Sequence, residues 1–177
     1  MRLFVALDLP DPILKTLVAL MASLKPAASI QWTAAANLHI TTKFIGEWPE
    51  ERLGRLKSGL AALPRHGPIP VHVKDLGWFP SPHSARSFWA GVHAPSALNT
   101  IAAASAKAAA ELGLPTERRA LHPHVTLARI KQPVDLAPLR QAVAALESVD
   151  FGAFEARSQF LYLSKLSVYT KLEEFPL

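Results

Sequence analysis

Apolar and polar residues alternate along residues 38–44, which read Leu-His-Ile-Thr-Thr-Lys-Phe. A period of two is typical of a β-strand with one buried face, because successive side chains of a strand point to opposite sides. The apolar positions are predicted to face the core: Leu38, Ile40 and Phe44. The polar positions are predicted to share the other face: His39, Thr41 and Lys43. The strand therefore places an imidazole beside a hydroxyl on one surface.

The same kind of pattern divides the rest of the chain into further strands and helices. Strands are predicted over residues 3–7, 30–32, 69–73, 86–93, 121–130, 151–154 and 159–169. Helices are predicted where apolar residues recur every three or four positions, over residues 12–24, 49–63, 96–112 and 134–146. Asp11 is predicted to cap the first helix. Prolines place the strand at residues 69–73 at a sheet edge, and residues 77–82 are predicted to form a loop.

The His-x-Thr pattern occurs twice. Residues 123–127, Pro-His-Val-Thr-Leu, repeat it with His124 and Thr126 in a second predicted strand. Each of the two strands follows a helix and is itself followed by a helix and a strand, which is the order of a duplicated unit. We therefore predict an α+β fold of two pseudo-symmetric lobes, each an antiparallel sheet with helices on its outer face, around a central cleft. Residues 1–177 are predicted to form one such domain, with the two motif strands as central neighbours.

Composition narrows the function classes. The chain has 177 residues, half of them apolar, and is long enough to bury a sizeable core. It has no cysteine, which excludes disulfides, thiolate zinc sites and cysteine nucleophiles and suits a reducing cytoplasm. The first apolar run is too short for a signal peptide or a membrane span. The net charge of +5 suits a polyanionic partner such as RNA.

Two neighbouring motif strands would surround a phosphate-sized space with two imidazoles and two hydroxyls. Hydrolysis of a phosphodiester needs a base that takes a proton from water and an acid that protonates the leaving oxygen, and histidine can do either. The pattern does not decide which histidine has which role. Lys43 could add positive charge near the phosphate. Strict alternation turns Arg129 to the opposite face from His124, so Arg129 reaches the site only through a bulge or the strand end.

Two other function classes fit parts of this pattern. A metal hydrolase could use His39, His122 and His124 as ligands, although neither motif strand offers a carboxylate on that face. A non-catalytic RNA-binding module would explain the charge and the aromatic residues, which either pack in the core and loops or stack on bases. These aromatic residues are Trp32, Trp78, Phe79 and Trp89. Such a module leaves the duplicated His-Thr pairs without a role.

Several segments together resemble a known family. They are residues 2–10, residues 37–47 with the first motif, residues 89–92, residues 123–129 with the second motif, and residues 174–177. In these segments the chain is similar to the two-histidine phosphoesterase superfamily, and most similar to its branch of RNA 2′,3′-cyclic phosphodiesterases, formerly called 2′-5′ RNA ligases. Thr42 departs from the pattern of that branch, which usually has an aliphatic residue there. The segment at residues 164–169 is also shorter than the corresponding segment in that branch.

The resemblance implies metal-independent hydrolysis of a ribose 2′,3′-cyclic phosphate to a 2′-phosphate. It assigns His39 as the proton donor to the leaving 3′ oxygen and His124 as the base that acts on water. The phosphate-binding residues would be Thr41 and Thr126, and the further substrate-binding candidates Lys43 and Arg129. It implies no metal, and we expect no cofactor. We also expect a monomeric cytoplasmic enzyme without an obligate protein partner. The ligand would be RNA or a nucleotide with a 2′,3′-cyclic phosphate end, and reverse 2′-5′ ligation would be a side activity.

Overall fold

The computed structural model describes residues 1–114 and 121–177. Within these ranges the strands are β1 (Arg2–Asp8), β2 (Gln31–Trp32), β3 (His39–Glu47), β4 (Ile69–Phe79), β5 (Ser87–His93), β6 (His124–Arg129), β7 (Asp150–Ala156), β8 (Ser158–Lys165) and β9 (Val168–Pro176). The α-helices are α1 (Asp11–Leu24), α2 (Leu53–Ala61), α3 (Ser96–Glu111) and α4 (Ala137–Ala144). In the described part of the chain, no helix has the length and apolar character needed to cross a membrane.

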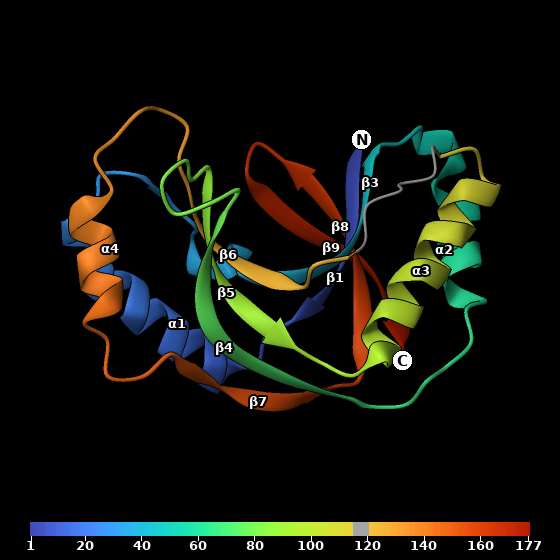
Figure 1. The fold of residues 1–177 in the computed structure, drawn as a ribbon. Coiled ribbons are helices and arrows are strands. Elements are labelled where there is room, and N and C mark those ends of the chain that lie inside the picture. Colours follow the sequence, from blue (N-terminus) through green and yellow to red (C-terminus); the bar gives the residue numbers. More distant parts are fainter. Residues whose placement is uncertain (115–120) are drawn as a thin grey trace.

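All the strands belong to one antiparallel sheet in the order β7-β4-β5-β6-β3-β1-β8-β9, with β2 paired to β6. At its centre, β3 and β6 meet through a single residue pair, Ile40 and Val125. The main path of the sheet is therefore two four-stranded halves joined at one point, with the short β2 added beside β6. Helices α1 and α4 lie at one end of the molecule, and α2 and α3 at the other (Figure 1). These features confirm the predicted α+β fold and the central position of the motif strands.

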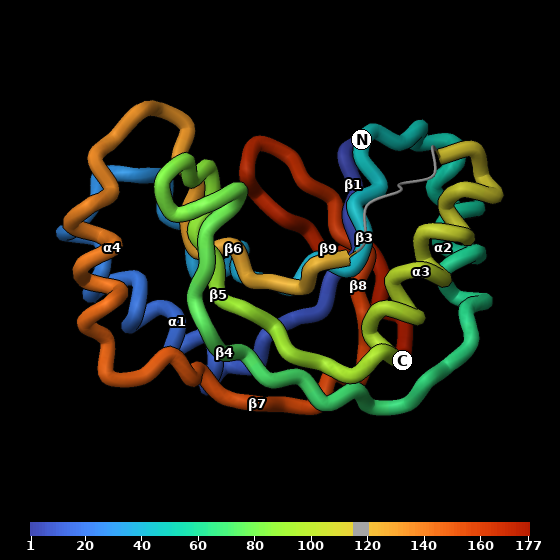
Figure 2. Tube along the Cα trace, viewed as in Figure 1, coloured from blue at the N-terminus to red at the C-terminus, as the bar shows by residue number. Residues whose placement is uncertain are grey.

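Two hydrophobic cores lie against the sheet, and the larger one extends into both of its halves. The core under α1 and α4 includes Leu17, Val71, Phe88 and Leu139. The core between the sheet and the α2–α3 pair includes Val5, Leu56, Ala109 and Leu161, and we call it the smaller core. Each lobe thus combines elements from both halves of the chain, whereas the repeat suggested one lobe for each half. The chain trace in Figure 2 shows why, because the late strands β7 and β8 return to pair with β4 and β1.

Strand β4 differs from its prediction in length and in place. It lies between β5 and β7, so it is not an edge strand. Pro70 is tolerated because it lies at the start of the strand, where a missing N–H matters least. Residues 77–79, predicted as part of a loop, continue the strand. Gly77 permits this because it has no side chain. A Cβ at this position would lie 2.1 Å from the Trp89 ring, which is too close.

The segment at residues 159–169 is a hairpin. β8 and β9 are joined by a two-residue turn at Leu166 and Ser167, whose φ angles are 49° and 63°. Positive φ at both central positions is the geometry of a tight hairpin turn, which usually takes glycine or asparagine. Neither is present at these two positions, so the turn could not be predicted from residue types.

The predicted cap of the first helix is wrong, because Pro10 takes that position and Asp11 already belongs to α1.

Candidate active site

The two His-x-Thr motifs lie on one face of the sheet where β3 and β6 meet. The paired residues Ile40 and Val125 are 0% exposed and point into the core. Because side chains alternate along a strand, their neighbours point to the opposite face: His39, Thr41, His124 and Thr126. All four are half-buried. Continuing the antiparallel register places each histidine across from the threonine of the other motif. We call this surface the histidine face.

Each motif strand has a β-bulge directly after its threonine. The unpaired residue is Thr42 in β3 and Leu127 in β6. A bulge can turn two consecutive side chains to the same side, which reverses the alternation that follows. Thr42 and Lys43 are accordingly both buried, as are Leu127 and Ala128. The residue five positions after each histidine then returns to the histidine face: Phe44 and Arg129.

The bulge in β3 overturns two expectations that rested on strict alternation. Lys43 is 7% exposed and pairs with Val5 of the smaller core, so it lies on the helix-covered face and not beside His39. Phe44, expected in the core, is 52% exposed. Its ring lies 6.4 Å from the ring of Phe4, which stacks on His39. Phe44 is therefore a residue of the histidine face that the sequence pattern missed.

The bulge in β6 brings Arg129 to the histidine face. A bulge was one of the two ways in which Arg129 was expected to reach the site, the other being the strand end. Its side chain is exposed. Burial lowers the pKa of both His39 and His124, and the positive charge of Arg129 lowers both further. Arg129 thus shares the face of the sheet on which a phosphate between the two imidazoles would lie. Arg129 is therefore suited to binding that phosphate.

Hydrogen bonds hold His39 at both ring nitrogens. Its Nδ1–H donates to the Asn37 carbonyl over 2.7 Å, and its Nε2 lies 2.9 Å from the Thr41 hydroxyl. The imidazole stacks on the ring of Phe4, with 4.8 Å between the centroids. Because a carbonyl only accepts, Nδ1 carries a hydrogen in either protonation state, and Nε2 is the nitrogen that can exchange a proton.

His124 is anchored in the same way in different surroundings. Its Nδ1–H donates to the His122 carbonyl over 2.7 Å, which again leaves Nε2 to exchange a proton. The edge of its ring meets Phe79 at 5.4 Å, and Trp89 lies 6.1 Å away. His122 itself is exposed and also contacts these two aromatic rings. Phe79 and Trp89 therefore form a wall beside the second motif.

The charges around the two histidines differ. Burial lowers the pKa of His39, while the Asn37 hydrogen bond and the negative charge of Asp8 raise it. Burial also lowers the pKa of His124, and its backbone hydrogen bond raises it, but the charge of His122 lowers it again. Only His39 has a carboxylate among the described groups that shift its pKa.

The remaining aromatic candidates belong to the core. Trp32 and Trp78 both contact the fully buried Phe88, with ring centroids 6.2 and 4.4 Å away.

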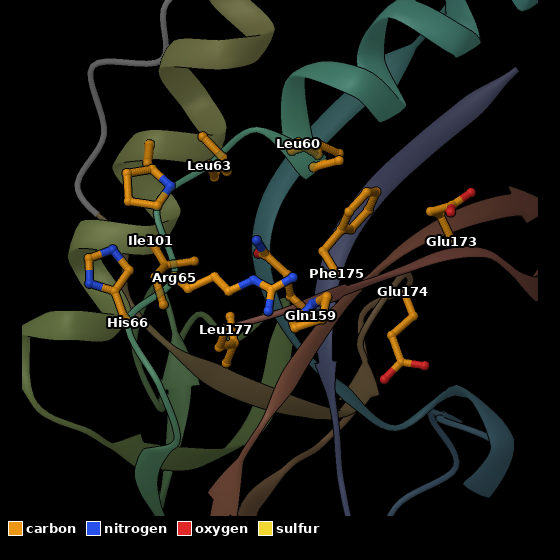
Figure 3. Close-up of a pocket in the computed structure, with 14 residues that line it drawn as sticks. Leu60, Leu63, Arg65, His66, Ile101, Gln159, Glu173, Glu174, Phe175 and Leu177 are labelled. Carbon is orange, nitrogen blue, oxygen red and sulfur yellow. The ribbon is translucent and has the colours of Figure 1, made fainter.

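Among the residues that the structure describes, no group of three or more histidine, aspartate or glutamate side chains could hold a metal ion. The hollow in Figure 3 is lined by residues of α2, α3, β8 and β9 and of the segment after α2, and by none of the motif residues.

The fold and the paired motifs are those of a phosphoesterase of the two-histidine type. A family model described as LigT-like phosphoesterase matches residues 7–89 and 92–167. The chain belongs to this family.

Curated relatives extend over nearly the whole chain. The RNA 2′,3′-cyclic phosphodiesterase of Methanocaldococcus jannaschii is 31% identical over 99% of this chain and 100% of its own length. That of Thermus thermophilus is 31% identical over 100% of this chain and 90% of its own length. Among solved structures, a Thermus thermophilus protein has a TM-score of 0.84 at 28% identity, covering 100% of this chain and 98% of its own. Escherichia coli LigT in complex with 3′-AMP has a TM-score of 0.81 at 27% identity, covering 99% and 97%.

Proposed function

We propose that this protein hydrolyses RNA 2′,3′-cyclic phosphate ends to 2′-phosphates, without a metal ion, by acid–base catalysis between two histidines. The observation that carries the proposal is the shared face on which His39 and His124 lie, each across from the threonine of the other motif. Both imidazoles have Nδ1 anchored on a carbonyl, so both have Nε2 available for proton transfer. The names of the curated relatives support the substrate class.

The proposed reaction is one in-line displacement at phosphorus. His124 takes a proton from water as the water oxygen bonds to phosphorus. The bond between phosphorus and the 3′ oxygen breaks, and His39 gives its proton to that oxygen. The products are a free 3′-hydroxyl and a 2′-phosphate, and the two histidines have exchanged protonation states.

The threonines and Arg129 have a different task in this proposal. The hydroxyls of Thr41 and Thr126 donate to the non-bridging oxygens of the phosphate, and Arg129 offsets the charge that develops on them. Thr41 already contacts Nε2 of His39, so its hydroxyl connects the acid with the phosphate. These groups orient the phosphorus and move no proton. Lys43 has no part in this arrangement because it lies on the other face of the sheet.

The same groups would support a slow ligation. If a 5′-hydroxyl replaces water, His124 takes its proton, and the displacement of the 3′ oxygen forms a 2′-5′ linkage. We expect this to be a side activity, because water is present at far higher concentration than an RNA end. We further propose that the chain acts as a single-domain monomer on RNA or on nucleotides, in the cytoplasm.

The direct test is the product formed from a nucleoside 2′,3′-cyclic phosphate in excess EDTA. We expect turnover to the 2′-phosphate alone, identified by ³¹P NMR against the authentic 2′- and 3′-phosphates. Formation of the 3′-phosphate would contradict the assignment of the leaving oxygen. Tight RNA binding with no turnover would instead identify a non-catalytic RNA-binding module.

A further inference from the structure

The residues paired with the two histidines differ in a way that the motifs do not reveal. Antiparallel pairing places Asp8 of β1 beside His39 and Gly91 of β5 beside His124. Paired residues of neighbouring strands have their side chains on the same face. His39 therefore has a carboxylate next to it on the histidine face, and His124 has no side chain at the equivalent position.

The absence of a side chain beside His124 follows from close packing of the backbone. A Cβ at Gly91 would lie 2.5 Å from the carbonyl oxygen of Lys74, closer than real Cβ contacts come. No aspartate can occupy this position unless β4 and β5 move apart. The difference between the two histidines is thus fixed by how the strands pack.

Asp8 is held in place by residues of β8 and β9. Its Oδ1 accepts a hydrogen bond from the Tyr162 hydroxyl, and its Oδ2 lies 2.6 Å from Nζ of Lys171. The rings of Tyr162 and His39 both stack on Phe4, with centroids 5.2 and 4.8 Å away, and they lie 6.5 Å from each other. Burial and the Asp8 carboxylate raise the pKa of Tyr162, so the hydroxyl stays protonated and donating. One cluster of three rings therefore positions both the imidazole and the carboxylate.

The charged and titratable groups around His39 come from four strands. They are Asp8 of β1, Arg129 and His124 of β6, Tyr162 of β8, and Tyr169 and Lys171 of β9. Among these groups, all of which lie in the described part of the chain, Asp8 is the only anion. Its field favours the imidazolium form of His39, and the ammonium of Lys171 partly neutralises that field.

We propose that Asp8 is a positioning residue that favours the protonated form of His39 against the effect of burial, with Lys171 setting the strength of the effect. The pairing of the strands then gives the two histidines different roles. His39, beside a carboxylate, is the proton donor, and His124, beside a glycine, is the base. This inference rests on the proposed function and deepens it, because it names the residue that breaks the symmetry between two equal motifs.

The test compares two substitutions with opposite expected effects. Asp8→Asn removes the negative charge, so the pKa of His39 should fall further. Lys171→Gln leaves Asp8 uncompensated, so the pKa of His39 should rise by a smaller amount. Each shift is measured by NMR titration of the His39 ring and as the alkaline limb of the pH profile of kcat/KM on a nucleoside 2′,3′-cyclic phosphate. The matched control is Asp150→Asn, which removes an aspartate of β7 that is hydrogen-bonded to His72 of β4, and it should move neither.

Opposite shifts in the two variants, seen by both measurements, would support the inference. An unchanged His39 titration in both variants, or shifts in the same direction, would overturn it, as would shifts in the titration without any movement of the alkaline limb. If His39→Ala and His124→Ala abolish turnover while the limb stays in place in Asp8→Asn, the proposed function stands and this inference fails. If the wild-type protein does not hydrolyse the cyclic phosphate, both fail.

Discussion

Strands β3 and β6 share a backbone plan but present different side chains. Both carry His-x-Thr, both have a bulge after the threonine, and both anchor the histidine Nδ1 at 2.7 Å on the carbonyl two residues earlier. After the bulge, β3 presents the apolar Phe44 to the histidine face and β6 presents the cationic Arg129. The repeat therefore accounts for the geometry of the site, and positions outside the motifs decide what each half does.

The surroundings of the two histidines extend this contrast. His39 lies among stacked rings next to Asp8, and its Nε2 is bonded to Thr41. His124 lies against Trp89, near a second, exposed histidine. The first half of the site is packed and carries a negative charge, whereas the second is more open and positively charged. A hydrolase that needs one acid and one base can use this difference, because equal environments would give both histidines the same role.

The largest effect is expected from removing either histidine. His39→Ala and His124→Ala should each lower kcat/KM by roughly 10²- to 10⁴-fold, because each removes one of two required proton transfers. Thermal unfolding should change little, since both side chains are only half-buried. His83→Ala, at an exposed position, is the control and should keep full activity. Near-normal turnover in either variant would refute the acid–base pair.

The next effect tests the two residues that follow the bulges. Arg129→Ala should lower kcat/KM by about 10- to 100-fold, as expected for a lost bond between a cation and a phosphate of about 1.5–3 kcal/mol. Phe44→Ala should cost less than about tenfold and act mainly on KM, because a ring at this place can stack on a base but carries no charge. The comparison is made with the same nucleoside 2′,3′-cyclic phosphate. Equal losses would show that the two halves of the site do not divide their roles at these positions.

A smaller effect is expected from the threonines. Thr41→Ala and Thr126→Ala should each cost on the order of 1–3 kcal/mol in transition-state binding, because a neutral hydroxyl orients the phosphate but moves no proton. Thr41→Ser and Thr126→Ser keep the hydroxyl and should restore most of the activity. If the serine variants are as slow as the alanine variants, the threonines act through packing and not through hydrogen bonds to the phosphate.

The alternation of apolar and polar residues was sufficient to predict the shared face and the central pairing of the motif strands. Ile40 and Val125 are the buried pair, and their polar neighbours emerge together on the other side. This succeeded because the alternation in residues 38–41 and 123–126 is regular and because the pattern occurs twice. The α+β class followed from the order of helical and strand patterns for the same reason.

What could not be predicted lies where the backbone departs from a regular period. The bulges at Thr42 and Leu127 reverse the alternation, so Lys43 was placed on the wrong face and Phe44 was expected in the core. The turn at Leu166 and Ser167 has no glycine or asparagine to mark it. The pairing of Asp8 with His39 depends on the register of β1, which no local pattern reports.

The pH dependence of kcat/KM on a nucleoside 2′,3′-cyclic phosphate, measured with and without excess EDTA, tests the central claim most directly. Below the pKa of the base, activity falls because the base is already protonated; above the pKa of the acid, it falls because no proton remains for the leaving oxygen. We expect a bell-shaped profile that EDTA does not change. Because burial lowers the pKa of both histidines, its limbs should lie on the acid side of the ordinary imidazole value of about 6.5. A single limb, with activity lost on chelation and restored by zinc or manganese, would mean that the histidines bind a metal and do not form an acid–base pair.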